Sequence, residues 1–229
     1  MIAFVHKHKL NGIFVYIDNL LCYGSTKEIY KTNLYNLFQA LKKDNFRLKL
    51  LKSHHFIQDS LILFGFYIDL KNKNIRPEPD KINKIIDLPT PTTKKELRKF
   101  FGAVSYFSSF LPELQKHLAP LHDKTAKNKM FQWSDECDKK IFTIKKMLQT
   151  IPLLFLFNPA KHIHLVTDGA ATSHIAYTMY QVDENGSFVP IKFNSHRLSV
   201  TEARLRQYET ELLALVFSLI KEEAFLATN

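Results

Sequence analysis

The stretch from Arg76 to Trp133 constrains the fold of this chain more than any other. It reads RPEPDKINKIIDLPTPTTKKELRKFFGAVSYFSSFLPELQKHLAPLHDKTAKNKMFQW. Apolar residues recur in it at helical spacing, and the prolines of RPEP and LPTP separate the helical segments. Thr93 and Glu96 have the spacing of a capping box, which predicts a helix that starts there. The stretch therefore predicts a helical middle section between segments of different periodicity.

The start of this predicted helix is basic, and its continuation is aromatic. Its basic residues are Lys94, Lys95, Arg98 and Lys99, and Phe100, Phe101, Tyr106, Phe107 and Phe110 follow them. Basic side chains interleaved with aromatic rings suit a surface that follows a phosphate backbone. Aromatic residues at helical spacing are also ordinary core residues, so we expect most of the rings to be buried and the cations to be the contacts. The net charge of +10 favours a polyanionic partner, although a lysine-rich surface can simply be solvated.

An apolar, β-branched segment, IFVYID, occupies positions 13–18, and LLCYG follows it at 20–24. The two read as strands joined at Asp18 and Asn19. A carboxylate at the tip of a hairpin can hold a divalent cation, whereas Asp-Asn is also an ordinary turn former, and these residues leave both readings open. A capping box of Ser25 and Glu28 predicts a helix after the hairpin. The alternation over 46–70 then predicts two or three strands.

After position 152 the pattern changes again to strands. HIHLVTD ends at Asp168, a second strand spans 173–182, and DENG at 183–186 predicts a hairpin turn. A third capping box, Ser199 with Glu202, predicts a final helix, whose run from 212 to 220 is almost wholly apolar and predicts burial. Glu211 stands at the edge of that run, where a carboxylate is costly without a cation. We expect Asp168 to be its partner, with a metal shared between them.

The sequence also argues against several classes of protein. Cys22 and Cys137 have no cysteine or histidine neighbour at ligand spacing, which argues against a structural zinc site or a disulfide framework. No apolar run is long enough for a membrane span, and no signal-peptide pattern is present. We therefore expect a protein of the cytoplasm or nucleus that is neither secreted nor bound to a membrane.

Taken in order, these motifs carry a family resemblance. The succession YIDN, RPEPDKI, LPTPTTKKELRKFFGAVSYFSSFLPELQKHLAPL, FQWSDEC, HLVTDGA and QYETELLAL resembles the Pol polyprotein of gypsy-type LTR retrotransposons. The resemblance covers nearly the whole chain and implies an α+β fold. In that reading 1–70 is the C-terminal part of a reverse transcriptase palm, 71–130 is the thumb, and 131–229 is a truncated ribonuclease H-like α/β domain. Residues 134–150 form its connecting helix.

The resemblance also implies roles for individual residues. YIDN resembles the Tyr-x-Asp-Asp hairpin of the polymerase, so Asp18 becomes a catalytic ligand of Mg²⁺ (or Mn²⁺), with Asn19 in the place of the second aspartate. Asp168 and Glu211 match the first two of the four metal-binding carboxylates of ribonuclease H. LFG at 63–65 resembles the turn that steadies the primer end, so Gly65 and Phe66 become nucleic-acid-binding residues.

The sequence departs from the family pattern, and these departures leave two possible functions open. His174-Ile175-Ala176 stands where the ribonuclease usually has Gly-x-Gly, and the match ends before the other ribonuclease carboxylates, so we expect incomplete ligand sets. One reading is a reverse transcriptase and ribonuclease H fragment that is catalytically incomplete as this chain. The other is a non-catalytic remnant that acts at most as a nucleic-acid-binding protein. The expected partners are RNA–DNA hybrid, primer–template and the rest of a Pol polyprotein.

Overall fold

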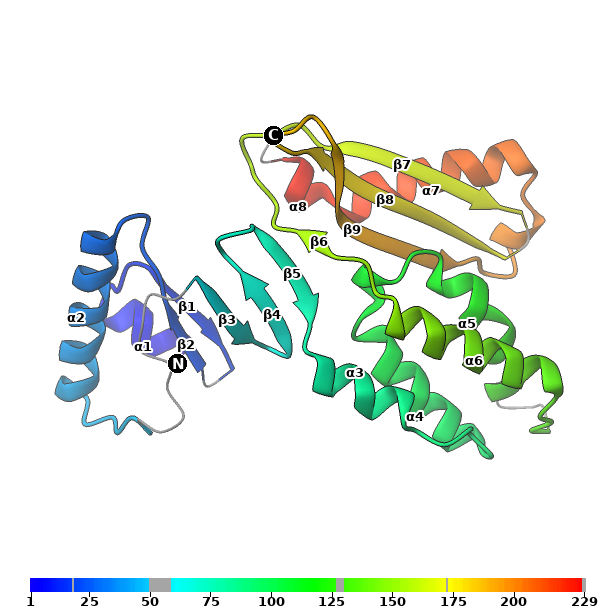
Figure 1. The fold of residues 1–229 in the computed structure, drawn as a ribbon, viewed down its shortest axis with the longest axis horizontal. Coiled ribbons are helices and arrows are strands. Elements are labelled where there is room, and N and C mark those ends of the chain that lie inside the picture. Colours follow the sequence, from blue (N-terminus) through cyan, green and yellow to red (C-terminus); the bar gives the residue numbers. More distant parts are fainter. Residues whose placement is uncertain (18, 50–58, 127–129, 172, 228–229) are drawn as a thin grey trace. The chain divides into compact units, whose positions relative to one another are not determined.

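The structure is a computed structural model that describes residues 1–17, 19–49, 59–126, 130–171 and 173–227. The chain divides into two compact units, Met1–Ile57 and Gln58–Asn229 (Figure 1). Both units combine helices with antiparallel strands, as predicted for an α+β protein. Within the described residues, none of the helices has both the length and the apolar character that crossing a membrane requires.

The first unit is a β-hairpin with two helices. Its elements are α1 (Ile2–Lys7), β1 (Ile13–Tyr16), β2 (Asn19–Cys22) and α2 (Lys27–Lys43). Strands β1 and β2 pair in the predicted hairpin, and Tyr16 lies opposite Asn19. The cap of α2 differs from the prediction, because the hydroxyl of Thr26, not Ser25, accepts the N–H of Ile29.

The second unit begins with a four-stranded antiparallel sheet. It contains β3 (Ser60–Leu63), β4 (Phe66–Asp69), β5 (Asn74–Pro77) and β6 (Leu154–Phe155) in that order. Leu63 pairs with Phe66, so Phe64 and Gly65 form a two-residue turn. Their φ angles of 53° and 77° are both left-handed, as a type I′ turn requires. Gly65 meets this requirement without the steric cost that a side chain would add.

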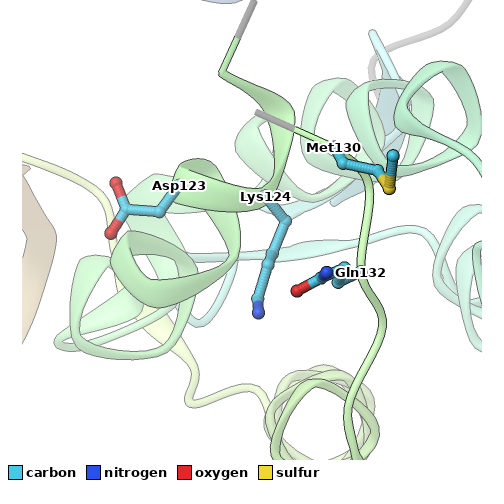
Figure 2. Close-up of a pocket in the computed structure, with 4 residues that line it drawn as sticks. All are labelled: Asp123, Lys124, Met130 and Gln132. Carbon is cyan, nitrogen blue, oxygen red and sulfur yellow. The ribbon is translucent and has the colours of Figure 1, made fainter. Parts of the chain in front are cut away.

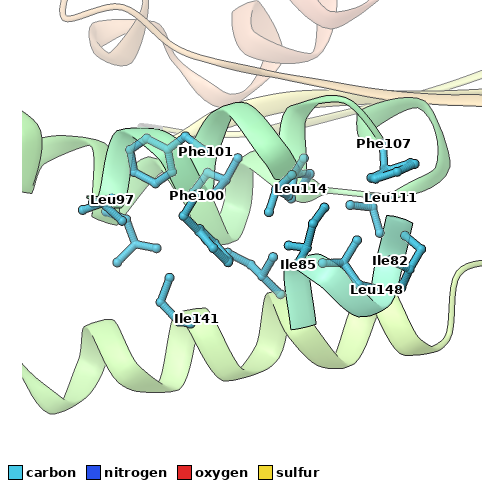
Figure 3. Packing of buried hydrophobic residues seen from close by; sticks show 14 of the residues in the cluster. Ile82, Ile85, Leu97, Phe100, Phe101, Phe107, Leu111, Leu114, Ile141 and Leu148 are labelled. Carbon is cyan, nitrogen blue, oxygen red and sulfur yellow. The ribbon is translucent and has the colours of Figure 1, made fainter. Parts of the chain in front are cut away.

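Four helices lie between β5 and β6 in the chain and bury the largest hydrophobic core among the described residues. They are α3 (Pro79–Ile86), α4 (Lys94–Ser105), α5 (Leu114–His122) and α6 (Asp135–Gln149), with short 3₁₀ turns η2 (Ser108–Phe110) and η3 (Asp123–Thr125). Leu97, Phe100 and Ile141 are among the side chains that meet between the helices (Figure 3). Thr93 caps α4 as predicted. The expected burial of the rings holds for Phe100, Phe101, Phe107 and Phe110, whereas Tyr106 stays 50% exposed.

The rest of the second unit is a three-stranded antiparallel sheet packed against helices. It comprises β7 (His164–Ala170), β8 (His174–Val182), β9 (Phe188–Arg197), η4 (Glu202–Arg204), α7 (Gln207–Lys221) and α8 (Glu223–Leu226). Asp168, Ala176 and Ser195 lie opposite one another in one row across the sheet, so their side chains share a face. The start of α5 is bonded to Ser195 on that face. Helix α7 lies along the other face, where Phe217 stacks on His196 (Figure 1).

The predicted burial of 212–220 is wrong. Leu212 is 60% exposed and Ile220 is 72% exposed. The residues of α7 that are buried are small and recur every fourth position: Thr210, Ala214 and Ser218. This narrow stripe faces the sheet together with the partly buried Leu213 and Phe217, whereas Leu212 and Ile220 stay exposed. The capping box of Ser199 and Glu202 forms as predicted, but it lies at the start of η4, and α7 begins later, at Gln207.

Candidate carboxylate and nucleic-acid sites

Asp168 lies near the end of β7 with its side chain exposed. It pairs with Ala176 of β8, so its carboxylate is on the face of the sheet that α5 partly covers. The three residues that replace the family's Gly-x-Gly are all buried: His174 (4% exposed) and Ala176 (7%) share this face, and Ile175 (1%) lies on the opposite face against α7. Burial lowers the pKa of His174 and Lys116 adds to that effect, while the nearby Glu113 and Asp168 oppose it.

Glu211 lies in the second turn of α7, against the residue that follows Asp168. A Cβ atom on Gly169 would come within 2.8 Å of the backbone nitrogen of Glu211 and of the carbonyl group of Thr210. The side chain of Gln207 donates to the carbonyl oxygen of Gly169 at 2.6 Å and to Oε1 of Glu211 at 3.1 Å. Gln207 was not among the site residues predicted from the sequence. Its spacing of four residues from Glu211 on a helix was the available signal.

The two carboxylates approach the edge strand β7 from different faces of the sheet. Asp168 projects on the face of α5, while Glu211 belongs to α7 on the opposite face. Both side chains are exposed, and both offer the hard oxygen donors that Mg²⁺ and Mn²⁺ prefer. Across the described residues there is no group of three or more histidine, cysteine, aspartate or glutamate side chains placed to hold a metal. A Mg²⁺ ion held by these side chains would therefore keep most of its water ligands.

The structure describes the β1–β2 hairpin, which resembles the polymerase motif, except for its aspartate. Asp18 lies outside the described residues. Ile17 beside it has a left-handed φ of 56° and a 78% exposed side chain, an unusual state for a β-branched residue. Strained backbone of this kind is found preferentially at functional turns. Asn19 begins β2 and pairs with Tyr16.

The four predicted basic residues of α4 fall into two pairs. Lys94 donates to the carbonyl oxygen of Ala126, and Arg98 donates to that of Thr125 at 2.8 Å. These two side chains therefore bind the chain at the end of η3. Lys95 and Lys99 are exposed and lie one turn apart on another face of the helix.

The face of Lys95 and Lys99 continues to the end of α4 through Gly102 and Tyr106, at helical spacing. Apart from the neighbouring residues and backbone of α4 itself, no described atom lies within 4 Å of the position that a Cβ on Gly102 would take, so the helix surface is open there. The hydroxyl of Tyr106 donates to the carbonyl oxygen of Phe64, in the turn that holds Gly65. We call Lys95, Lys99, Gly102, Tyr106 and Gly65 the α4 stripe.

Phe66 fixes the β3–β4 turn onto the helices. Its ring stacks on Tyr106 at a centroid distance of 5.3 Å and on Phe110 at 5.4 Å. The side chain is partly buried and belongs to the edge of the helical core. Phe66 is thus placed to position the turn, and Gly65 is the residue of the pair that lies on the stripe.

A shallow cavity of about 320 Å³ lies beyond the end of α5. Asp123, Lys124, Met130 and Gln132 line it (Figure 2). None of the predicted site residues is among them, and the open, mixed lining gives no set of converging polar groups.

Comparisons with known proteins agree with one another. Residues 133–229 match the family described as the RNase H-like domain found in reverse transcriptase. The chain is 26% identical over 211 residues to the transposon Tf2-7 polyprotein of Schizosaccharomyces pombe, which covers 92% of this chain and 16% of that protein. It is 30% identical over 224 residues to the retrovirus-related Pol polyprotein from transposon opus of Drosophila melanogaster, which covers 93% of this chain and 22% of that protein.

Two solved structures of the foamy viral protease-reverse transcriptase share the fold. The complex with dsDNA has a TM-score of 0.80 at 22% identity and covers 100% of this chain and 47% of that one. The complex with RNA/DNA hybrid has a TM-score of 0.78 at 21% identity and covers 98% of this chain and 30% of that one. The α+β fold and the resemblance to Pol polyproteins are therefore confirmed. Residues 133–229 thus match the RNase H-like domain found in reverse transcriptase, and nearly the whole chain is similar to a part of retrotransposon Pol polyproteins that makes up less than a quarter of their length.

Proposed function

We propose that this chain binds RNA–DNA hybrid and primer–template as part of a reverse transcriptase, and that Asp168 and Glu211 are metal ligands of its ribonuclease H site. The observation that carries the proposal is the contact of Gly169 with the backbone of Glu211. It fixes a carboxylate-bearing helix beside the residue that follows Asp168. The foamy viral structures with the same fold are complexes with dsDNA and with RNA/DNA hybrid, which supports the choice of ligand.

A divalent metal supplies this kind of site with an activated water and with charge stabilisation at the phosphate. Asp168 and Glu211 are the residues that would hold it, and Gln207 keeps the Glu211 side chain at the β7 edge. Asp18 would hold the metal of the polymerase. Asn19 beside it has the size of an aspartate but no charge, and we expect weaker metal binding there.

The α4 stripe is the proposed contact for the nucleic-acid backbone. Lys95 and Lys99 provide charge, Gly102 lets a strand approach the helix, and Tyr106 presents a half-exposed ring. In this proposal Lys94 and Arg98 support the stripe by holding α4 to η3. The division into a palm part (1–70), a thumb (71–130) and a ribonuclease H-like part (131–229) belongs to the same proposal.

A nucleic-acid-binding protein without catalysis is the second candidate. Asn19, which stands in place of a second aspartate, favours this candidate. So does the finding that, among the described residues, no third carboxylate, histidine or cysteine is placed to hold a metal with Asp168 and Glu211. The two candidates differ in what a metal ion does. A metal site should strengthen hybrid binding through Asp168 and Glu211, whereas the stripe alone should bind equally well without the ion.

Titration of a labelled RNA–DNA hybrid with the whole chain tests both parts. We expect Mg²⁺ to tighten binding, and Asp168→Asn or Glu211→Gln to abolish that increment. Replacing Lys95 and Lys99 by alanine should make the negative slope of log K against log salt shallower by about two, because two phosphate contacts are lost. No hybrid binding by the wild-type chain at low salt would refute the proposal, and binding that ignores Mg²⁺ in all variants would favour the non-catalytic candidate.

A further inference from the structure

Helix α5 lies across β8 and β9 on the same face of the sheet as Asp168. At its start, the backbone nitrogen of Gln115 donates to the hydroxyl of Ser195 at 3.1 Å. Just beyond its end, Asp123 pairs with Arg197 at 2.7 Å. Contacts at both ends thus fix the position of this helix on the sheet.

The first of these contacts lies in the row of Asp168. Ser195 is opposite Ala176, and Ala176 is opposite Asp168. Neighbouring strands are about 4.8 Å apart, so the backbones of Ser195 and Asp168 are separated by about 10 Å. Gln115 is bonded to Ser195, and the next residue of α5 is Lys116.

Lys116 carries an ammonium group near Asp168 that a ligand could reach. It donates to Oε2 of Glu113 at 2.9 Å, and the two side chains are 55% and 44% exposed. The bond to Glu113 raises the pKa of Lys116, and Asp168 adds to the rise, which supports their proximity. An exposed ion pair of this kind is weak, so a phosphate can replace Glu113 as the partner of the ammonium.

The strands themselves offer little contact surface at this point. His174 and Ala176 share the face of Asp168, and both are buried. A nucleic-acid strand that lies against the Asp168 carboxylate on this face therefore meets the start of α5. The charged side chains there are Glu113 and Lys116.

We propose that Lys116 binds a backbone phosphate of the nucleic-acid strand that lies against Asp168, and that Glu113 holds its ammonium group when no nucleic acid is bound. The helical part of the second unit thereby contributes a residue to the ribonuclease H-like site. This inference rests on the proposed function, because it needs the hybrid to lie at Asp168.

Opposite effects of the two partners provide the test. Binding of a fluorescein-labelled RNA–DNA hybrid to the whole chain is measured by anisotropy without divalent metal, over a series of salt concentrations. Lys116→Gln should weaken binding and reduce the salt slope by about 0.9, the value for one phosphate contact, and Lys116→Arg should retain both. Glu113→Gln should bind as tightly as the wild type or more tightly, because the ammonium is released and a negative charge is removed. An ion pair that only maintains the structure would make Lys116→Gln and Glu113→Gln weaken binding alike, and that result would overturn the proposal.

A double-mutant cycle with Asp168→Asn tests the location. Two side chains that face the same phosphate should show coupled effects on binding, whereas distant side chains should be additive. Lys139→Gln, an exposed lysine of α6, is the matched control and should leave its own cycle with Asp168→Asn additive. Additivity of Lys116→Gln and Asp168→Asn would overturn the location.

The failures of the two proposals are distinguishable. If Lys95 and Lys99 contribute to the salt slope and Lys116→Gln changes nothing, the further inference is wrong and the proposed function stands. If the wild-type chain does not bind the hybrid, both are wrong.

Discussion

Gly169 of β7 touches the backbone of Glu211 on α7, and no residue with a side chain fits between them. A Cβ atom at position 169 would lie 2.8 Å from the nitrogen of Glu211. The neighbours at that distance are backbone atoms, which cannot rotate away as the end of a side chain can. One glycine therefore sets how closely the helix that bears Glu211 approaches the strand that bears Asp168.

Gly169→Ala should separate α7 from β7. We expect a loss of about 1–3 kcal/mol in the free energy of unfolding, the usual cost of an overpacked contact, and a loss of the Mg²⁺-dependent part of hybrid binding. Urea denaturation and the hybrid titration measure the two effects. Gly102→Ala is the matched control for the stability measurement, because the space around Gly102 is open and alanine favours a helix by about 0.5–1 kcal/mol. Equal stability of the two variants would contradict the prediction.

Lys192 neutralises a buried carboxylate at the end of α7. Its ammonium lies 2.7 Å from Glu222, whose side chain is 1% exposed. Lys192→Met would leave that charge without its cation, and we expect a cost of about 3 kcal/mol, the lower end for a buried pair because Lys192 itself is partly exposed. Adding Glu222→Gln should recover much of the loss in urea denaturation. A double variant less stable than Lys192→Met alone would be inconsistent with this account.

Tyr177 should make the second unit sensitive to alkali. Burial and the hydrogen bond that it donates to Glu222 raise the pKa of Tyr177 above the ordinary value of about 10. The folded state keeps a proton that the unfolded state releases, so this contribution to stability is complete below about pH 10 and is lost as the pH rises further. Unfolding free energies measured from neutral to alkaline pH should fall more steeply for the wild type than for Tyr177→Phe. Parallel curves would show that Tyr177 does not contribute.

The elements of this fold were predictable where local patterns determine them. The strands ending near Tyr16 and Asp168, and the helix capped by Thr93, follow from apolar periodicity and capping residues within a few positions. The predicted strand that ends at Asp168 and the apolar run beside Glu211 singled out these two carboxylates, and the family resemblance assigned their roles. Their contact through Gly169 and the bond from Gln207 depend on how α7 packs on β7, which no local pattern encodes.

The exposure of side chains was harder to predict than the elements. The apolar run from 212 to 220 predicted burial, yet the fully buried positions of α7 are small residues such as Ala214, and Leu212 and Ile220 stay exposed. The basic start of α4 predicted four equivalent contacts. Tertiary packing instead directs Lys94 and Arg98 to the carbonyls of Ala126 and Thr125, which lie far along the chain.

The outer face of α7 should tolerate charge. Leu212 and Ile220 are 60% and 72% exposed, so Leu212→Lys and Ile220→Lys should each change the free energy of unfolding by less than about 0.5 kcal/mol. Ala214 is 1% exposed, and Ala214→Leu should cost about 1–3 kcal/mol through overpacking. Thermal and urea denaturation give the comparison. A large loss for either lysine variant would show that this face is covered in the folded chain.

The four basic residues of α4 should separate into a supporting pair and a binding pair. Lys94 and Arg98 donate to backbone carbonyls of Ala126 and Thr125, so replacing both by alanine should lower the free energy of unfolding by about 1–3 kcal/mol, because the hydrogen bonds of two charged groups are lost. The salt slope of hybrid binding should stay close to that of the wild type. Lys95 and Lys99 are exposed, and their replacement should leave stability within about 0.5 kcal/mol while it lowers the slope by about two.

Urea denaturation and the salt series on the same two double variants therefore give opposite patterns. The comparison is internal, since both variants lose the same net charge from the same helix, and a general electrostatic effect would change the two slopes equally. Equal slopes would mean that hybrid binding depends on net charge and not on the α4 stripe. A slope that falls only for the variant of Lys94 and Arg98 would place the nucleic acid at the end of η3 instead.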